Sequence, residues 1–162
     1  MAREPAGHET VRESLLDRLL DDHPDEHREA QSTRDEALRR LTLAVRRDLE
    51  WLLGTRLTWV DEDLLGTELA SRSVVTYGLQ DFSHENLGNT DAQQRLRRAI
   101  EQAIAVFEPR LARVVVTSEA PDPNRRALRF RIDAILDVSP VRAPVSFDTL
   151  MELNGQTQVS EA

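Results

Sequence analysis

The tripeptide Glu108-Pro109-Arg110 separates two kinds of sequence pattern and limits how the chain can fold at that point. Proline has no backbone N–H to donate, and it disfavours helical geometry at the residue before it. A helix that reaches this point must therefore end near Phe107. In an extended stretch Glu108 and Arg110 lie on one face, because residues two apart in a strand do so. The arrangement favours a charge pair used for a partner or for register, although an ordinary surface ion pair has the same spacing.

Two amphipathic helices are predicted before this tripeptide. In the first, from about Thr33 to Leu53, apolar residues recur three and four positions apart, and Gly54 has the position of a C-cap. The second helix begins at Thr90-Asp91-Ala92-Gln93, which has the form of a capping box. Its predicted buried stripe comprises Leu96, Ile100, Ala103, Ile104 and Phe107.

Strand patterns dominate the sequence after the tripeptide. We predict strands at Arg113–Ser118, Ala127–Asp137 and Pro144–Leu153, with an earlier short strand at Ser73–Leu79. The second of these alternates cleanly and is expected to be half-buried and antiparallel. Its apolar side comprises Leu128, Phe130, Ile132, Ala134 and Leu136; its polar side comprises Arg129, Arg131, Asp133 and Asp137. Helices followed by a strand meander predict an α+β fold, in which a small antiparallel β-meander packs on the long helices.

The domain organisation follows from composition. Residues 1–36 are polar and acidic, and we expect a flexible arm that contains one short amphipathic helix within Leu15-Leu16-Asp17-Arg18-Leu19-Leu20. Residues 37–155 are expected to form the α+β domain, and residues 156–162 a disordered tail. A short helix cannot bury its own apolar face, so the arm must dock on its own domain or on another chain.

Charge and residue usage exclude several classes of function. The chain has 162 residues with 29 acids against 21 bases, and its net charge of -8 argues against nucleic acid as the principal ligand. It has no cysteine, which excludes disulfides and thiol catalysis. No apolar run is long enough to span a membrane, and the first residues lack a secretory signal. We therefore expect a cytoplasmic protein.

No catalytic or metal-binding pattern emerges. So many carboxylates always supply some pair spaced like that of a glycosidase, and such an enzyme needs aromatic residues along a cleft. Aromatic residues make up 4% of the chain and fall mostly on predicted core faces, including Trp51, Tyr77, Phe107 and Phe130. His23 and His27 are four apart, but Pro24 lies between them and no third ligand is evident, which favours solvated histidines. Ser83 and His84 have no acid at a recognisable spacing. We predict no catalytic residue, no metal and no cofactor.

Four motifs in order resemble one family. Glu108-Pro109-Arg110 resembles the Glu-Pro-Arg signature of the TssE family of type VI secretion baseplate subunits, which is similar to the small wedge protein of contractile phage tails. Ser14-Leu15-Leu16-Asp17-Arg18-Leu19 is similar to the N-terminal motif of that family, and residues 45–53 with Thr55-Arg56 to its first long helix. The central motif is matched by Ser73-Val74, Tyr77-Gly78-Leu79 and Asp81, with Thr76 and Gln80 in place of the usual Asn and Pro.

The resemblance implies a non-enzymatic subunit of a contractile injection machine. Members of this family lie in baseplate wedges, contact other wedge subunits and the base of the sheath, and have a sheet that sheath strands can extend. An unpaired sheet edge is indeed a template for strand addition. The implied location is the cytoplasm, in a baseplate docked at the inner membrane complex. Two alternatives remain open: a peptidoglycan-cleaving, lysozyme-like enzyme, and a small adaptor that binds a regulatory protein.

The resemblance also implies which residues contact partners. Glu108 and Arg110 would form the charged core of the contact, with Pro109 holding their register. The arm would be anchored by the residues of its short helix, and the central motif would complete the surface. These further residues are Leu15, Leu16, Arg18, Leu19, Tyr77, Gly78, Leu79 and Asp81.

Overall fold

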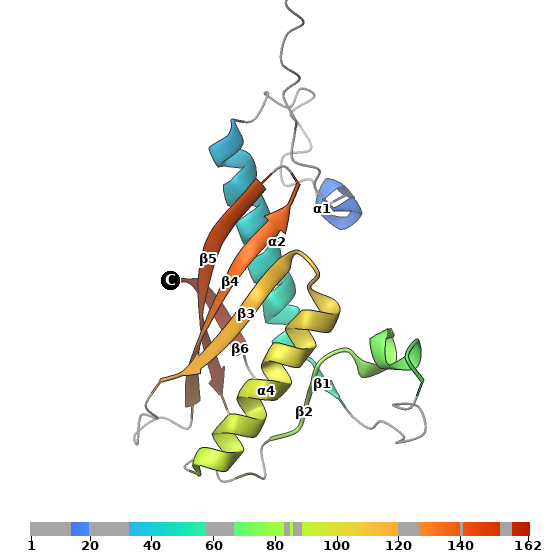
Figure 1. The fold of residues 1–162 in the computed structure, drawn as a ribbon, viewed down its shortest axis with the longest axis vertical. Helices are drawn as coiled ribbons and strands as arrows, with labels where there is room; N and C mark the ends of the chain where they lie inside the picture. Colours follow the sequence, from blue (N-terminus) through green and yellow to red (C-terminus); the bar gives the residue numbers. More distant parts are fainter. Residues whose placement is uncertain are drawn as a thin grey trace, which may run out of the picture.

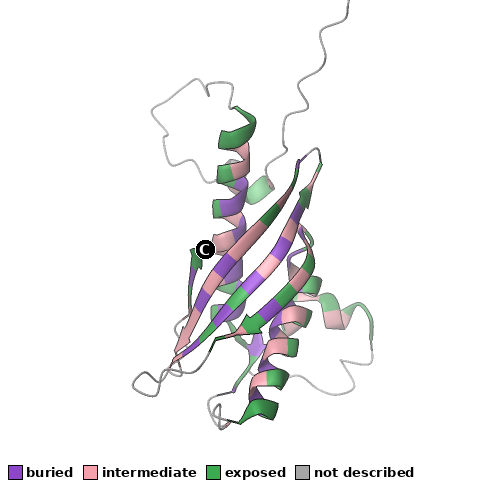
Figure 2. Ribbon diagram, turned by 60° about the vertical axis from the view of Figure 1, so that its left-hand side comes forward, coloured by how far each residue is buried: buried purple, intermediate pink, exposed green. Residues whose placement is uncertain are grey.

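A computed structural model describes residues 14–19, 33–57, 67–82, 85, 89–119, 127–139, 141–152 and 157–162. Within them lie two long helices, α2 (Arg34–Gly54) and α4 (Thr90–Phe107), and a four-stranded antiparallel sheet. The sheet has the order β3-β4-β5-β6, with β3 at Leu111–Ser118, β4 at Ala127–Val138, β5 at Val141–Glu152 and β6 at Thr157–Glu161. Both long helices cover one face of the sheet, and no described helix covers the other face (Figures 1 and 2). The predicted α+β class is confirmed.

The core lies between the helices and the sheet. The alternation predicted for the second strand is confirmed in β4, whose residues Leu128, Phe130, Ile132, Ala134 and Leu136 are all buried. They pack against the buried stripes of α2 and α4, which include Val45, Leu49, Leu96, Ile100 and Ile104. β4 and β5 pair along their full length from Ala127↔Glu152 to Val138↔Val141, which makes this hairpin the centre of the sheet.

The caps of the long helices differ in part from the prediction. α2 begins after Thr33, which forms a capping box with Glu36, so the helix starts inside the segment expected to be an arm. The N-cap of α4 is Asn89, whose Oδ1 accepts a 3.0 Å hydrogen bond from the N–H of Asp91, and Thr90 is the first helical residue. The predicted box at Thr90 is therefore wrong by one residue, because Asn caps a helix as well as Thr does.

The segment Ser73–Leu79, predicted as a strand, is mostly a tight turn. It contains the 3₁₀ turn η2 (Val74–Thr76), preceded by η1 (Ala70–Arg72), and only Leu79–Gln80 form a strand, β2. The Thr76 hydroxyl donates to the carbonyls of Ser71 and Ser73 at 3.0 Å. Local bonds of this kind give the backbone an alternative to a strand ladder, which overrides the β-branched composition. β2 pairs in parallel with β1 (Arg56–Leu57).

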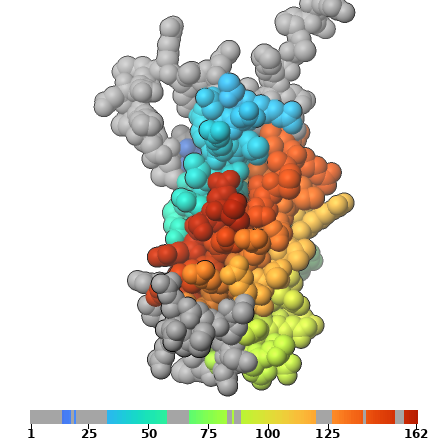
Figure 3. All heavy atoms as spheres, turned by 90° about the vertical axis from the view of Figure 1, so that its left-hand side faces the viewer, coloured from blue at the N-terminus to red at the C-terminus, as the bar shows by residue number. Residues whose placement is uncertain are grey.

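The C-terminal residues form a strand, where we expected a disordered tail. β6 pairs with β5 from Met151↔Thr157 to Phe147↔Glu161. Val159 is buried, and the Thr157 hydroxyl reaches the carbonyl of Leu53 at the end of α2. Figure 3 shows β6 in red between α2 in cyan and β5 in orange. Backbone pairing with β5 and burial of Val159 offset the cost of ordering this short segment.

Candidate functional site

The junction between α4 and β3 is fixed by backbone hydrogen bonds on both sides. The N–H of Glu108 donates to the carbonyl of Ile104 at 2.8 Å, which is the last bond of α4. The N–H of Asp137 donates to the carbonyl of Arg110 at 2.8 Å, which ties the junction to β4. The predicted end of the helix at Phe107 is thus confirmed, and the junction is held rigidly between a helix and the sheet.

Glu108 and Arg110 face each other across this junction. Arg110 Nε donates to Glu108 Oε1 at 2.6 Å, and Arg110 Nη2 donates to Glu108 Oε2 at 2.5 Å, so the pair is bidentate. Glu108 is only 4% exposed, although it is charged. Arg110 Nη2 also donates to Asp48 Oδ2 of α2 at 2.5 Å. The charge pair predicted from the sequence is therefore part of the domain interior and connects the junction to α2.

A second arginine extends the network to the N-terminal helix α1 (Leu15–Leu19). Arg47 Nη2 donates to Asp17 Oδ1 at 2.7 Å and to Asp48 Oδ1 at 2.9 Å. Asp17 Oδ2 also lies 3.8 Å from Arg110 Nη1. We call Asp17, Arg47, Asp48, Glu108 and Arg110 the charged cluster. It joins α1, α2 and the α4–β3 junction, with three carboxylates around two guanidinium groups.

The pKa shifts agree with these contacts. For Arg110, burial works to lower the pKa, but the hydrogen bonds and charges of Glu108 and Asp48 outweigh it and raise the pKa above its ordinary value. For Asp17, burial works to raise the pKa, but hydrogen bonds from Ser14 and Arg47 and the charges of Arg47 and Arg110 lower it overall. The cluster therefore holds these groups in their charged forms.

Tyr77 lies beside the cluster. Its ring packs edge-to-face on Phe107, the last residue of α4, with ring centroids 5.2 Å apart and an interplanar angle of 72°. The pKa of the Tyr77 hydroxyl is raised, first by burial and then by the negative charges of Asp48 and Glu108. The central sequence motif and the Glu-Pro-Arg motif thus meet in space, although 31 positions, from 77 to 108, separate them in the chain.

Gly78, next to Tyr77, adopts a backbone conformation that favours glycine. Its φ is +112°, a value that L side chains rarely adopt, and a Cβ at this position would lie 2.5 Å from the carbonyl oxygen of Thr55. The next residue, Leu79, donates its N–H to that same carbonyl at 2.9 Å. Leu79 is buried in the core, whereas Asp81 is exposed. Both line a small cavity of about 50 Å³ at the C-terminal end of α2.

The apolar residues of α1 point away from the domain. Leu15 and Leu19 are 77% and 78% exposed, and Leu16 is 43% exposed. The helix is held instead by its polar side, through Asp17, with the Ser14 hydroxyl bonded to the same carboxylate. The side chain of Arg18 lies outside the described residues. Figure 1 shows α1 standing apart from the sheet.

The structure adds residues that sequence reasoning missed. Asp17, Arg47 and Asp48 complete the cluster, but Arg47 is 30 positions from Asp17 and Asp48 is 62 positions from Arg110, so no local spacing marks these two pairs. Trp51, expected in the core, is half exposed, with the guanidinium of Arg47 over its ring at 5.0 Å. More apolar surface lies at Val74 and Val75 of η2 and at Leu69, the residue before η1.

The described residues contain neither a metal-binding group nor a helix that could span a membrane. Among the described residues, no group of three or more His, Asp or Glu side chains could hold a metal ion. His23, His27, Ser83 and His84 lie outside the described residues. None of the described helices combines the length and apolar character needed to cross a membrane. The carboxylates of the cluster bind arginine rather than facing an apolar cleft.

Comparison with known proteins gives one positive finding. No curated protein matches the chain. A family model described as baseplate wedge protein gp25 matches residues 39–141, which is more than half of the chain. The match includes every member of the charged cluster except Asp17, together with Tyr77 and the Glu-Pro-Arg junction. The chain therefore belongs to the baseplate wedge protein gp25 family.

Proposed function

We propose that this protein is a non-enzymatic structural subunit of a type VI secretion baseplate wedge, which contacts other wedge subunits and the base of the sheath, where sheath assembly begins. Membership of the baseplate wedge family supports a structural role. The observation that carries the proposal further is the way α1 is docked. Its polar side binds the charged cluster, and its leucines face outward.

The docked α1 is suited to bind a partner. A helix of five residues is far shorter than the roughly 12 residues that an isolated helix needs for marginal stability in water. The exposed leucines of α1 contribute no hydrophobic stabilisation. Burial of one leucine in an interface would contribute about 2 kcal/mol to the free energy of binding. The ion pair from Asp17 to Arg47 sets where the helix lies before a partner arrives. The preferred occupant is an amphipathic helix of another wedge subunit, which would cover Leu15, Leu16 and Leu19.

The Glu-Pro-Arg junction has a supporting role in this proposal. Pro109 is exposed at the turn, while Glu108 and Arg110 on either side are bound inside the domain. The pair would hold Pro109 and α1 in fixed relative positions, since Arg110 lies near Asp17 as well as Glu108. Tyr77, which lies beside the cluster, would extend the same contact. Contact with the sheath would use an edge of the four-stranded sheet. The subunit would act in the cytoplasm, in a baseplate docked at the inner membrane complex.

Co-purification tests the proposal. The protein is expressed with candidate wedge and sheath subunits of the same secretion system, and each is captured through a tag. We expect at least one wedge subunit to be retained by the natural chain and lost with the double substitution Leu15→Ser and Leu19→Ser. Leu69→Ser is the matched control, because Leu69 is also highly exposed but lies next to η1 and not on α1. Equal retention by both variants would refute the role of α1, and release of peptidoglycan fragments by the pure protein would refute a non-enzymatic role.

A further inference from the structure

One edge of the sheet is formed by β3, which has β4 on one side and no further strand on the other among the described residues. The N–H of Glu119 donates to the carbonyl of Arg129 at 2.9 Å, so the backbone of Glu119 faces β4. Because alternate residues of a strand turn their backbone groups the same way, Thr117 and Val115 also face β4. The backbone groups of Val116 and Ser118 therefore face the free edge.

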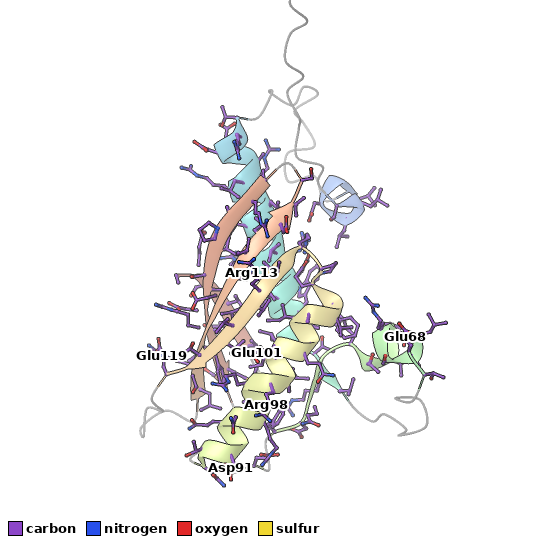
Figure 4. The ribbon with its side chains drawn as sticks, in the orientation of Figure 1. Glu68, Asp91, Arg98, Glu101, Arg113 and Glu119 are labelled. Carbon is purple, nitrogen blue, oxygen red and sulfur yellow. The ribbon has the colours of Figure 1, made fainter. Side chains whose placement is uncertain are left out.

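A side chain from α4 occupies this edge. Glu101 Oε1 accepts a hydrogen bond from the N–H of Val116 at 3.0 Å. Figure 4 shows Glu101 on α4 beside the middle of β3. A carboxylate that accepts from a backbone N–H makes a stronger bond than a neutral acceptor does. A charged side chain held against an unpaired strand is also a known way of preventing edge-to-edge association.

β3 is the edge that needs this protection. It has eight residues, and its middle, Val114-Val115-Val116-Thr117, is β-branched and uncharged, a composition that favours strand pairing. The opposite edge, β6, has only five residues, and a short edge strand is a weak template for pairing. A bulge between Ala112 and Val115, where Arg113 has a φ of +55°, blunts only the first part of β3, and the stretch from Val115 to Ser118 stays regular.

We propose that Glu101 is an edge lock, whose carboxylate occupies the free edge of β3 and prevents two copies of this chain from pairing through that edge. The edge is complementary to itself. In an antiparallel pair centred on Val116, the two Val116 residues exchange backbone hydrogen bonds, and Val115 lies opposite Thr117. Beyond Thr117 each strand runs past the bulge of the other copy, so Glu119 of one copy comes near Arg113 of the other without being in register with it. Both are exposed and of opposite charge, and they lie toward opposite ends of β3 (Figure 4).

Glu101→Ala tests the lock in the full-length protein. Sedimentation is expected to show that this variant forms dimers at concentrations where the natural chain does not. Glu101→Met is the second variant, because it keeps the side-chain length and helix propensity but has no acceptor. Gln102→Ala, at the exposed neighbouring position of α4, is the matched control and should behave as the natural chain. Glu101→Gln keeps an acceptor oxygen and should stay monomeric.

Amide exchange and charge reversal identify the edge. In a dilute, monomeric sample of Glu101→Ala, the Val116 amide should exchange about tenfold faster or more, the loss expected for a hydrogen bond to a charged group, while Thr117 is unchanged. Adding Glu119→Arg should abolish the dimer by placing arginine beside the arginine of the other copy, and adding Arg113→Glu as well should restore it. The proposal would be overturned by an unchanged exchange rate of the Val116 amide. It would also be overturned if both Glu101→Ala and Glu101→Met stay monomeric, or if the dimer persists after Glu119→Arg is added.

Discussion

Arg110, in the turn that leads into β3, donates a 2.5 Å hydrogen bond to Asp48 of α2, a residue 62 positions earlier in the chain. The same guanidinium holds Glu108 in a bidentate pair and approaches Asp17 of α1. Arg110 thus connects three segments that the sequence keeps far apart. The Glu-Pro-Arg motif therefore has a structural role inside the domain. A partner contact at this junction would depend on that internal role.

The first prediction concerns the stability of this pair. Arg110→Ala leaves Glu108 buried without its main counter-charge and should lower the free energy of unfolding by about 3–5 kcal/mol. Glu108→Ala should cost less, about 1–3 kcal/mol, because Arg110 keeps Asp48. Arg131→Ala is the control: its pair with Asp148 is nearly half exposed, so its loss should lower the free energy of unfolding far less than the loss of Arg110. Urea denaturation measures all three, and equal small losses would show that the cluster does not stabilise the fold.

The second prediction concerns the docking of α1 and its pH dependence. Docking lowers the pKa of Asp17 below its ordinary value of 3.8. The ionised carboxylate therefore stabilises the docked helix above pH 3.8, and this contribution is lost as the pH falls through the lowered value. The chain has no cysteine, so a nitroxide on Leu19→Cys reports α1 alone. Its mobility should rise on acidification below pH 3.8, whereas with Asp17→Asn it should be high already at neutral pH. A label equally immobile in both proteins at neutral pH would contradict docking through Asp17.

The third prediction concerns Tyr77, the only tyrosine of the chain, whose ionisation is directly visible in the ultraviolet absorbance. Its pKa should lie above the ordinary 10.0, because burial and the charges of Asp48 and Glu108 disfavour the phenolate. The neutral ring stabilises the fold below pH 10, and this contribution is lost as the pH rises through the raised pKa. Tyr77→Phe should remove that alkaline loss, and Asp48→Asn should lower the pKa of Tyr77. An ordinary pKa would place Tyr77 away from the cluster.

The fourth prediction compares the effect on stability of adding a side chain at Gly78 and at Gly54. Gly78→Ala forces a side chain into a positive-φ position against Thr55 and should destabilise the fold by about 1–3 kcal/mol, with loss of the β1–β2 pairing. Gly54→Ala is the matched control, because the nearest atom to its added Cβ is 3.9 Å away and the residue is helical. It should be neutral or stabilising by up to about 1 kcal/mol. Thermal melts measure both, and a neutral Gly78→Ala would mean that the turn tolerates a side chain.

Much of the fold was predictable because its signals are local. The stripes of α2 and α4 and the alternation of β4 follow from the positions of apolar residues, and the stop at Pro109 follows from proline chemistry. The 3₁₀ turn at Val74–Thr76 was missed because hydroxyl bonds from Thr76 outweigh β propensity. β6 was missed because its five residues carry little pattern of their own and become a strand only beside β5.

The candidate site was predictable only in part. The sequence indicated Glu108, Arg110 and the leucines of α1, because motif and composition mark them. It did not reveal Asp48 or Arg47, whose partners depend on how α2 lies against the α4–β3 junction. It also placed Trp51 in the core, although the residue lies on the exposed face of α2 and stacks with Arg47. Long-range ion pairs leave no trace in local spacing, so they required the three-dimensional structure.

The most direct test of the central claim is sheath assembly in cells that carry the complete secretion system, with a fluorescent sheath subunit as the readout. The natural chain and Leu69→Ser should support sheath formation, whereas the double substitution Leu15→Ser and Leu19→Ser should abolish it. The exposed leucines contribute nothing to the core, so the melting temperature of the double variant should match that of the natural chain. Normal sheath formation by a stable double variant would contradict the account, because it would show that the face presented by α1 is not a contact of the wedge.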